Sequence, residues 1–163
     1  MSSESLEAIV QGLVDERAIT RRLHDYAHGL DYGPEEAFVD NFTDDATWQR
    51  LPGRRPAQVF SGRAALQQMY RDHVHAPEYF HKHMVANAKV DVDGDTAAAR
   101  SYLILIAEHP TGPYVRGFSR CTDHIIRCAD GQWRIQDRKA ELENWSDRDF
   151  PPRPWTQTPE VVG

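Results

Sequence analysis

Four stretches of alternating apolar and polar residues fill most of the second half of the chain. They are 80–92, 95–109, 113–128 and 132–143, and the tripeptides DGD, PTG and ADG lie between them. Alternation with a period of two is typical of strands that bury one face, and these tripeptides favour tight turns. The pattern therefore predicts a meander of four long antiparallel strands.

The first half of the chain has helical spacing instead. Apolar residues recur three and four positions apart from about residue 4 to residue 30, and a Gly-Pro pair at 33–34 then gives a stop signal. A short helix near 34–41, a strand at DDATWQRL and a helix capped by Ser61 are expected next. Helices followed by a meander indicate an α+β domain over 1–145, with a curled sheet that is wrapped around the first helix.

Such a curled sheet, closed at one end by a helix, leaves a cone with an open mouth, which is a natural site for a small molecule.

The formal charge of −6 argues against a nucleic acid or an anionic membrane as partner. The longest apolar run, YLILIA, is too short to span a bilayer. Cys121 and Cys128 lie too far apart on one expected strand to form a disulfide. We expect a cytoplasmic protein with an extended or disordered proline-rich tail at 146–163.

Asp31 lies at the edge of the apolar stripe of the first helix. On a helical wheel it falls about 140° from Tyr26, whereas His24 and His28 point to the solvated side. A carboxylate beside a buried face is costly unless it is paired or hydrogen-bonded. The sequence therefore predicts a partner for Asp31 further along the chain.

The expected partner is His83, near the start of the first long strand. Alternation places His81, Val85 and Asn87 on the same face of that strand. A histidine that bonds a carboxylate through one ring nitrogen becomes a stronger base at the other. With the phenol of Tyr26 nearby, a buried Asp–His pair is suited to general acid–base catalysis.

The order and spacing of several segments resemble the SnoaL-like branch of the cone-shaped nuclear-transport-factor-2-like (NTF2-like) family. The segments are AITRRLHDYAHGLDYG, FTDDATW, FSGRAAL, HKHMVAN and DGQWRI, within residues 12–145. Closest in pattern are bile-acid 7α-dehydratases and hexachlorocyclohexane dehydrochlorinase, with scytalone dehydratase more remote. The resemblance implies that Asp31 and His83 form a catalytic dyad and that Tyr26 matches a tyrosine of the bile-acid enzymes.

The chain departs from these relatives at two positions. The dehydrochlorinase has a lysine where this chain has Tyr26, which makes dehalogenation less favoured. The bile-acid enzymes have a carboxylate where this chain has Leu105, which weighs against a bile acid as substrate. Arg138 falls where an arginine can occur in the pocket of the dehydrochlorinase.

Residues and resemblance together favour a cofactor-independent lyase, which eliminates water from a small, cyclic hydroxylated or carbonyl-bearing substrate. His83, oriented by Asp31, is the expected base, and Tyr26 polarises the substrate or assists the leaving hydroxyl. The expected substrate-binding residues are Trp48, Asn87, Tyr102, Phe118 and Arg138. The alternatives are an isomerase or polyketide-type cyclase with the same dyad, and a non-catalytic ligand-binding or assembly subunit of the same fold.

Other histidines and aromatic residues have simpler interpretations. The histidines expected at the surface are His24, His28, His73, His75 and His81. The His-x-His pairs at 73–75 and 81–83 suggest a metal, but no third carboxylate or cysteine ligand can be placed, so no metal site is predicted. Trp133 and Ile135 are assigned to the core.

The stretch SYLILIA is apolar on both faces of its expected strand. A strand that reads as a continuous apolar run is normally covered on both sides, and the first helix covers only the inner face. We therefore expect a homo-oligomer that forms through the outer face of the sheet. A trimer is favoured over a dimer because the dehydratases that the chain resembles are trimeric.

Overall fold

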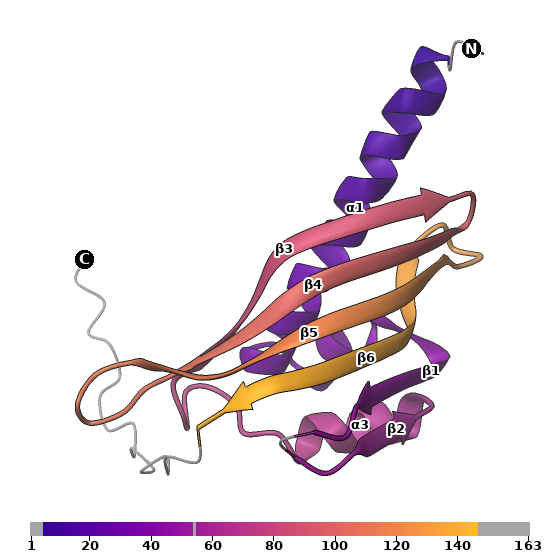
Figure 1. The fold of residues 1–163 in the computed structure, drawn as a ribbon. Coiled ribbons are helices and arrows are strands. Elements are labelled where there is room, and N and C mark those ends of the chain that lie inside the picture. Colours follow the sequence, from indigo (N-terminus) through magenta and orange to yellow (C-terminus); the bar gives the residue numbers. More distant parts are fainter. Residues whose placement is uncertain (1–4, 54, 147–163) are drawn as a thin grey trace, which may run out of the picture.

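The computed structural model describes residues 5–53 and 55–146, so all of the expected tail except its first residue lies outside the described residues. Helices and strands follow one another in the predicted α+β order (Figure 1). They are α1 (Leu6–Asp31), α2 (Glu35–Val39), β1 (Phe42–Arg50), β2 (Gln58–Ser61), α3 (Arg63–Arg71), β3 (His81–Asp93), β4 (Thr96–Ala107), β5 (Tyr114–Arg127) and β6 (Trp133–Trp145).

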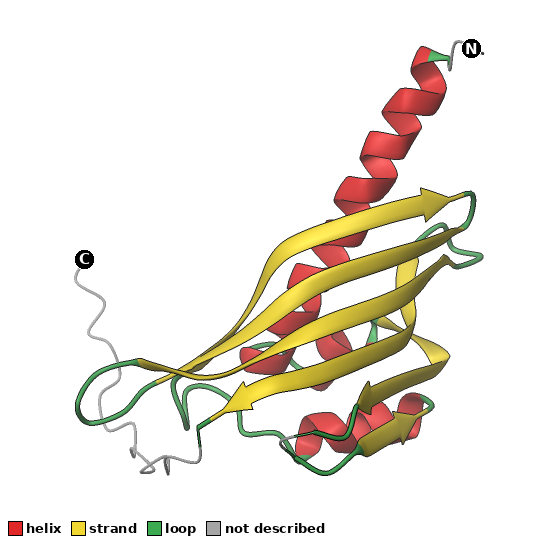
Figure 2. Ribbon diagram, viewed as in Figure 1, coloured by secondary structure: helices red, strands yellow, loops and turns green. Residues whose placement is uncertain are grey.

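The strands form one mixed sheet in the order β2-β1-β6-β5-β4-β3. Strands β3 to β6 are the predicted meander, with bounds within two residues of those expected, and each pairs antiparallel with the next. Strand β1 instead runs parallel to β6. Figure 2 shows the long strands curving across α1, and β2 and β3 remain as the two edges of an open sheet. The predicted fold class is confirmed.

Strand β2 was not predicted, and its presence changes the start of the next helix. Ser61 ends this strand, where its hydroxyl lies 3.4 Å from that of Thr47, so it does not cap α3. Gly62 takes the N-cap position with a φ of 80° and makes no side-chain cap. A positive φ is readily adopted by glycine, which allows the sharp change from strand to helix.

Helix α1 is buried mainly in its C-terminal half. Ile19, Leu23 and Leu30 are buried against the concave face of the sheet. The N-terminal half extends past the sheet in Figure 1, and Leu6 there is 75% exposed. Trp133, predicted to belong to the core, is 3% exposed and is part of the buried core cluster. Among the described helices, none has both the length and the apolar character that a membrane span needs.

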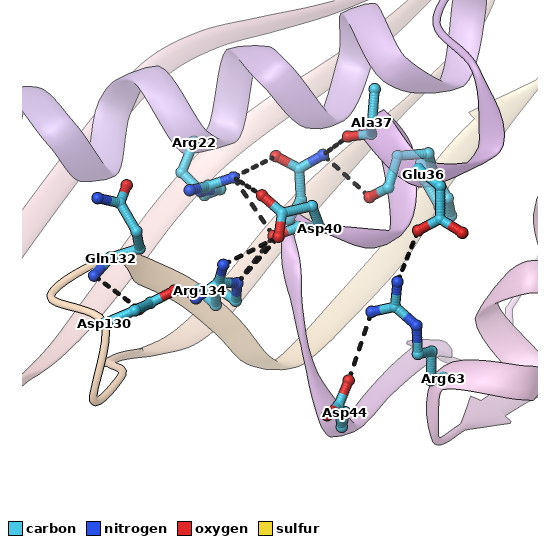
Figure 3. Close-up of polar contacts among 11 residues, drawn as sticks. Arg22, Glu36, Ala37, Asp40, Asp44, Arg63, Asp130, Gln132 and Arg134 are labelled. Carbon is cyan, nitrogen blue, oxygen red and sulfur yellow. Dashed lines mark hydrogen bonds and ion pairs between the residues drawn. The ribbon is translucent and has the colours of Figure 1, made fainter.

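The last turn of α1 packs directly on α2. A Cβ atom added to Gly29 would lie 2.9 Å from the Cα of Phe38, so this close approach requires a glycine. Ion pairs fix the same region from outside: Asp40 lies 3.3 Å from Arg22 of α1 and 2.9 Å from Arg134 of β6 (Figure 3). The helix end that carries Asp31 is therefore held in place from several sides.

A fully buried ion pair joins β5 and β6. Arg138 donates two hydrogen bonds to the carboxylate of Asp123, at 2.6 and 3.0 Å, and neither side chain is more than 1% exposed. Although burial alone lowers the pKa of Arg138, the charge of Asp123 raises it above the ordinary value. The guanidinium also lies 4.1 Å from the ring centroid of Tyr26. Asp123 therefore keeps a buried cation stable beneath that tyrosine.

We predict that Asp123→Asn lowers the free energy of unfolding by about 3–5 kcal/mol, because it leaves Arg138 buried without its counter-charge. Urea denaturation measures this loss. The matched control is Asp91→Asn, which breaks the exposed pair with Arg100 and is expected to cost far less, because solvent screens that pair. Equal losses in the two variants would contradict the structural importance of the buried pair.

Candidate functional site

A cavity of about 340 Å³ lies between α1 and the concave face of the sheet. Its wall is largely apolar and includes Leu30, Trp48, Phe60, Met69, Leu103 and Leu142. A smaller group of polar side chains also lines it: Arg50, Arg55, Gln58, Asp72, His73 and His83. An apolar cavity with a few converging polar groups is typical of a site for a small organic molecule.

The structure brings Asp31 and His83 into direct contact at this cavity. Nδ1 of His83 lies 2.6 Å from Oδ1 of Asp31, and the backbone N–H of His83 donates to Oδ2 at 2.8 Å. Because a carboxylate only accepts, Nδ1 carries the hydrogen, and the lone pair of the neutral ring is on Nε2. No described residue hydrogen-bonds that second nitrogen.

The backbone around Asp31 explains how the two side chains meet. Asp31 is the last residue of α1, and its carbonyl accepts a hydrogen bond from the N–H of Ala76 at 3.0 Å. This bond draws the segment between α3 and β3 over the helix end, and β3 begins at His81. Burial alone raises the pKa of Asp31, but its contact with His81 and the hydrogen bonds that it accepts from His83 hold the pKa below its usual range. Asp31 is therefore ionised at neutral pH.

Three histidines predicted to lie at the surface belong to this site instead. His81 is 5% exposed, and its Nε2 lies 3.2 Å from Oδ1 of Asp31. His73 is partly buried, and burial together with the neighbouring His83 and His81 lowers its pKa to about 3. His75 is half-buried, with ring nitrogens 2.8 Å from the carbonyl oxygens of Leu30 and Tyr70. The repeated His-x-His spacing was the signal in the sequence that could have identified them.

Tyr26, predicted to be catalytic, and Trp48, predicted to bind the substrate, both line the cavity. Tyr26 is 1% exposed, and its ring packs edge-on against Phe42 at a centroid distance of 5.9 Å. Burial raises the pKa of its phenol, although the charge of Arg138 acts in the opposite direction. Tyr26 is therefore a neutral hydrogen-bond donor at the wall of the cavity.

Tyr102 and Phe118 do not line the cavity, contrary to prediction. They are 48% and 40% exposed on the outer face of the sheet. Alternation along β4 explains the difference, because Leu103 and Leu105 point into the cavity and their neighbours point out. Their aromatic character suggested a cavity wall, but their position in the alternation of the strands places them on the outer face.

Asn87 and Arg138 also lie away from the cavity wall. Asn87 is exposed, with a φ of 51°, at a bulge between Ala86 and Lys89 where β3 shifts register against β4. An extra residue reverses the alternation of the strand, so Asn87 leaves the face that His83 occupies. Arg138 lies beneath Tyr26 and is held by Asp123, as described above.

Two arginines at the cavity were missed by the sequence analysis. Arg50 comes from the end of β1, and Arg55 lies between β1 and β2, where no strand pair had been predicted. Arg50 donates to the carbonyl of Pro56 at 3.1 Å, and the guanidinium of Arg55 lies 4.7 Å from the ring of Trp145. Among the described residues, no carboxylate forms an ion pair with either arginine.

Comparison with known proteins places this geometry in context. The model of the SnoaL-like domain matches residues 11–139. An NTF2-like protein with a cystatin-like fold from Novosphingobium aromaticivorans is 22% identical, with a TM-score of 0.76 over 90% of this chain and 95% of that one. A protein of unknown function from Mycobacterium tuberculosis is 24% identical, with a TM-score of 0.73 over 83% and 76% of the chains.

ActVI-ORFA from Streptomyces coelicolor is 20% identical, with a TM-score of 0.67 over 78% of this chain and 96% of that one. At such identities the likeness shows the fold alone, and it confirms the expected NTF2-like architecture. A search among curated proteins gives no significant match.

Proposed function

Because the chain belongs to the SnoaL-like domain family, which includes enzymes, we propose that it is a lyase that eliminates water by acid–base catalysis. The observation that carries this proposal is the contact between Asp31 and His83 at the wall of an apolar cavity. The proposed substrate is small and cyclic, with a hydroxyl group and a carbonyl or similar activating group.

In the proposed reaction, the free Nε2 of His83 removes a proton from the carbon next to the activating group. Asp31 accepts a hydrogen bond from the Nδ1–H of His83 and stabilises the imidazolium that forms. The electrons of the broken C–H bond form the new double bond, the C–O bond breaks, and the hydroxyl leaves as water with a proton from His83 or Tyr26. A correctly positioned base accelerates such a reaction about 10²–10⁴-fold, so the positioning of the substrate in the cavity supplies the remaining rate acceleration.

The two cations at the cavity indicate the chemistry of the substrate. Burial lowers the pKa of Arg50, and repulsion by the nearby charge of Arg55 lowers it further. A carboxylate or other anionic oxygen on the substrate would relieve this repulsion and pair with a guanidinium. We therefore propose a substrate with an apolar ring and an anionic group.

An isomerase or a polyketide-type cyclase is the alternative that the same dyad supports, since both reactions begin with the removal of a proton from carbon. Product analysis separates these reactions from elimination, because isomerisation releases no water. A non-catalytic assembly subunit would need no ionised Asp–His pair at an open cavity, so the site geometry favours an enzyme.

We predict that His83→Ala and Asp31→Asn each reduce turnover at least about 100-fold. The first removes the base, and the second removes the charge that stabilises the protonated base. Tyr26→Phe is expected to cost less, since it removes only a hydroxyl. Dehydration of cyclic hydroxy-ketones, followed through the absorbance of the enone, measures the rates. The control is His24→Ala, on the exposed side of α1. Undiminished turnover in His83→Ala would show that the base is elsewhere.

If Arg50 and Arg55 bind an anionic group of the substrate, cyclic hydroxy acids should bind better than their uncharged methyl esters. We therefore predict that the acids raise the melting temperature of the protein more than the esters do. Arg50→Gln is expected to abolish this preference, because it removes one of the two cations at the cavity. Arg100→Gln, on the exposed part of β4, is the matched control. Equal shifts for acids and esters in the wild-type protein would contradict an anionic substrate.

We also propose a homo-oligomer that forms through an outer patch of the sheet, lined by Tyr102, Ile104, Phe118, Arg120 and Glu143. The patch combines exposed aromatic rings, which are enriched in protein interfaces, with charges of both signs that can form ion pairs with a neighbouring copy. A trimer remains the favoured state because of the resemblance to trimeric dehydratases.

Light scattering after size exclusion tests the assembly. We expect a mass that is a multiple of the 18.7 kDa chain, and Phe118→Glu is expected to reduce it to one chain by placing a charge in the patch. Val59→Glu is the control, since Val59 is 60% exposed on β2. A wild-type mass near 18.7 kDa at micromolar concentration would contradict the proposal.

A further inference from the structure

Four side chains with metal-binding atoms converge beside the cavity. They are Asp31, His73, His81 and His83, and one ligand atom from each lies within 4.8 Å of those of the others. We propose that they form a binding site for one divalent transition-metal ion, with Zn²⁺ as the best fit to the donor set. The inference goes beyond the proposed lyase and holds whatever reaction the cavity supports.

The hydrogen bonds of His81 give the most specific support. Its Nδ1 lies 2.9 Å from the carbonyl oxygen of Tyr79, which only accepts, so Nδ1 carries a hydrogen. In the neutral ring Nε2 then presents a lone pair, 3.2 Å from Oδ1 of the ionised Asp31. Two acceptors this close repel each other unless a cation or an added proton lies between them. A metal ion would bind both lone pairs.

His73 supplies a second buried nitrogen without a partner. No described residue hydrogen-bonds its Nε2, and the atom is shielded from solvent. A buried polar atom of this kind costs free energy unless something binds it. Because His73 and His81 come from different segments, two independent observations point to a ligand at the same place.

The spacing of the three histidine rings matches the spacing expected for three imidazole ligands of one metal ion. The ring centroids of His73, His81 and His83 lie 5.2, 5.4 and 5.4 Å apart. With Zn–N bonds of about 2.1 Å and tetrahedral angles, three imidazole centroids around one ion would stand about 5.3 Å apart. Ring packing alone also gives such distances, but it does not gather four ligand atoms within 4.8 Å.

Outer hydrogen bonds hold the ligands in a suitable orientation. The carbonyl of Tyr79 fixes the ring of His81, and the backbone N–H of His83 holds Oδ2 of Asp31, so that Oδ1 is directed at the rings. Histidine ligands of metals usually donate their other ring N–H to a carbonyl or carboxylate in this way. The cluster therefore has the supporting contacts of a metal-binding site.

The donor set indicates which ion would bind and what it could do. Imidazole nitrogens suit Zn²⁺, Fe²⁺, Ni²⁺ and Cu²⁺, whereas Mg²⁺ and Ca²⁺ prefer oxygen ligands. His73 and His83 line the cavity, so an ion held there would be accessible to a small molecule. It would polarise a carbonyl oxygen or ionise a bound water. It would also compete with the proton shared by Asp31 and His83.

Titration of the chelator-treated full-length protein with Co²⁺ tests the proposal, followed through the visible absorption of the ion. We expect one Co²⁺ per chain, with the intense bands of a low-coordinate site, and displacement by Zn²⁺ but not by Mg²⁺. His73→Ala and His81→Ala are each expected to weaken binding by more than about 100-fold, beyond the usual effect of an outer contact. His24→Ala and His28→Ala, on the exposed side of α1, should bind as the wild type does.

Absence of stoichiometric Co²⁺ binding to the wild-type protein would overturn the proposal, and so would unchanged affinity in both His73→Ala and His81→Ala. Circular dichroism confirms that each variant is folded, and the wild-type result decides the question even if a variant is not. Because the measured quantity is metal binding, the outcome is independent of the lyase proposal. Turnover by the chelator-treated protein tests that proposal separately.

Discussion

The buried carboxylate of Asp31 is the constraint on which the site depends. An ionised group at the inner end of a helix is stable only if surrounding groups neutralise it and hydrogen-bond it. Here the backbone N–H and the ring Nδ1–H of His83 donate hydrogen bonds to it, and the ring of His81 lies 3.2 Å away. The start of β3 and the end of α1 are therefore fixed relative to each other by a charge, in addition to apolar packing.

The cavity depends on how the sheet and α1 fit together. The sheet curves across the C-terminal half of α1 but stays open between its edges β2 and β3, so one helix cannot fill the concave side. The space that remains lies next to the Asp31–His83 pair. Beneath it, the buried pair of Arg138 and Asp123 supports Tyr26. An apolar cavity with an activated base at its wall thus follows from the way the sheet covers the helix.

The sequence predicted those features that depend on regular periodicity. The four long strands and the first helix were recognised from spacing, and the approach of Asp31 to His83 was predicted from a carboxylate that needed a partner. Features that depend on a local break were not predictable in this way. The bulge at Asn87 reverses the alternation of β3, and β2 is too short to give a periodic signal.

The histidine cluster shows a different limit of the sequence. His81 was assigned to the surface, although it belongs to one of the two His-x-His pairs, and the sequence does not show that Asp31 contacts two rings at once. That fact depends on the backbone bond from Ala76 to Asp31, which folds residues 72–80 over the helix end. The sequence could therefore predict that Asp31 has a partner, but only the tertiary structure shows which histidines besides His83 lie beside it.

Nitrogen-15 NMR of the histidine-labelled, chelator-treated protein tests the central claim most directly, because it shows which ring nitrogen carries the hydrogen. The account predicts that the neutral ring of His83 carries its hydrogen on Nδ1, toward Asp31, and presents the lone pair of Nε2, which can act as a base. A His83 ring with its hydrogen on Nε2 and a bare Nδ1 would contradict the account, because Asp31 could then not orient it for catalysis.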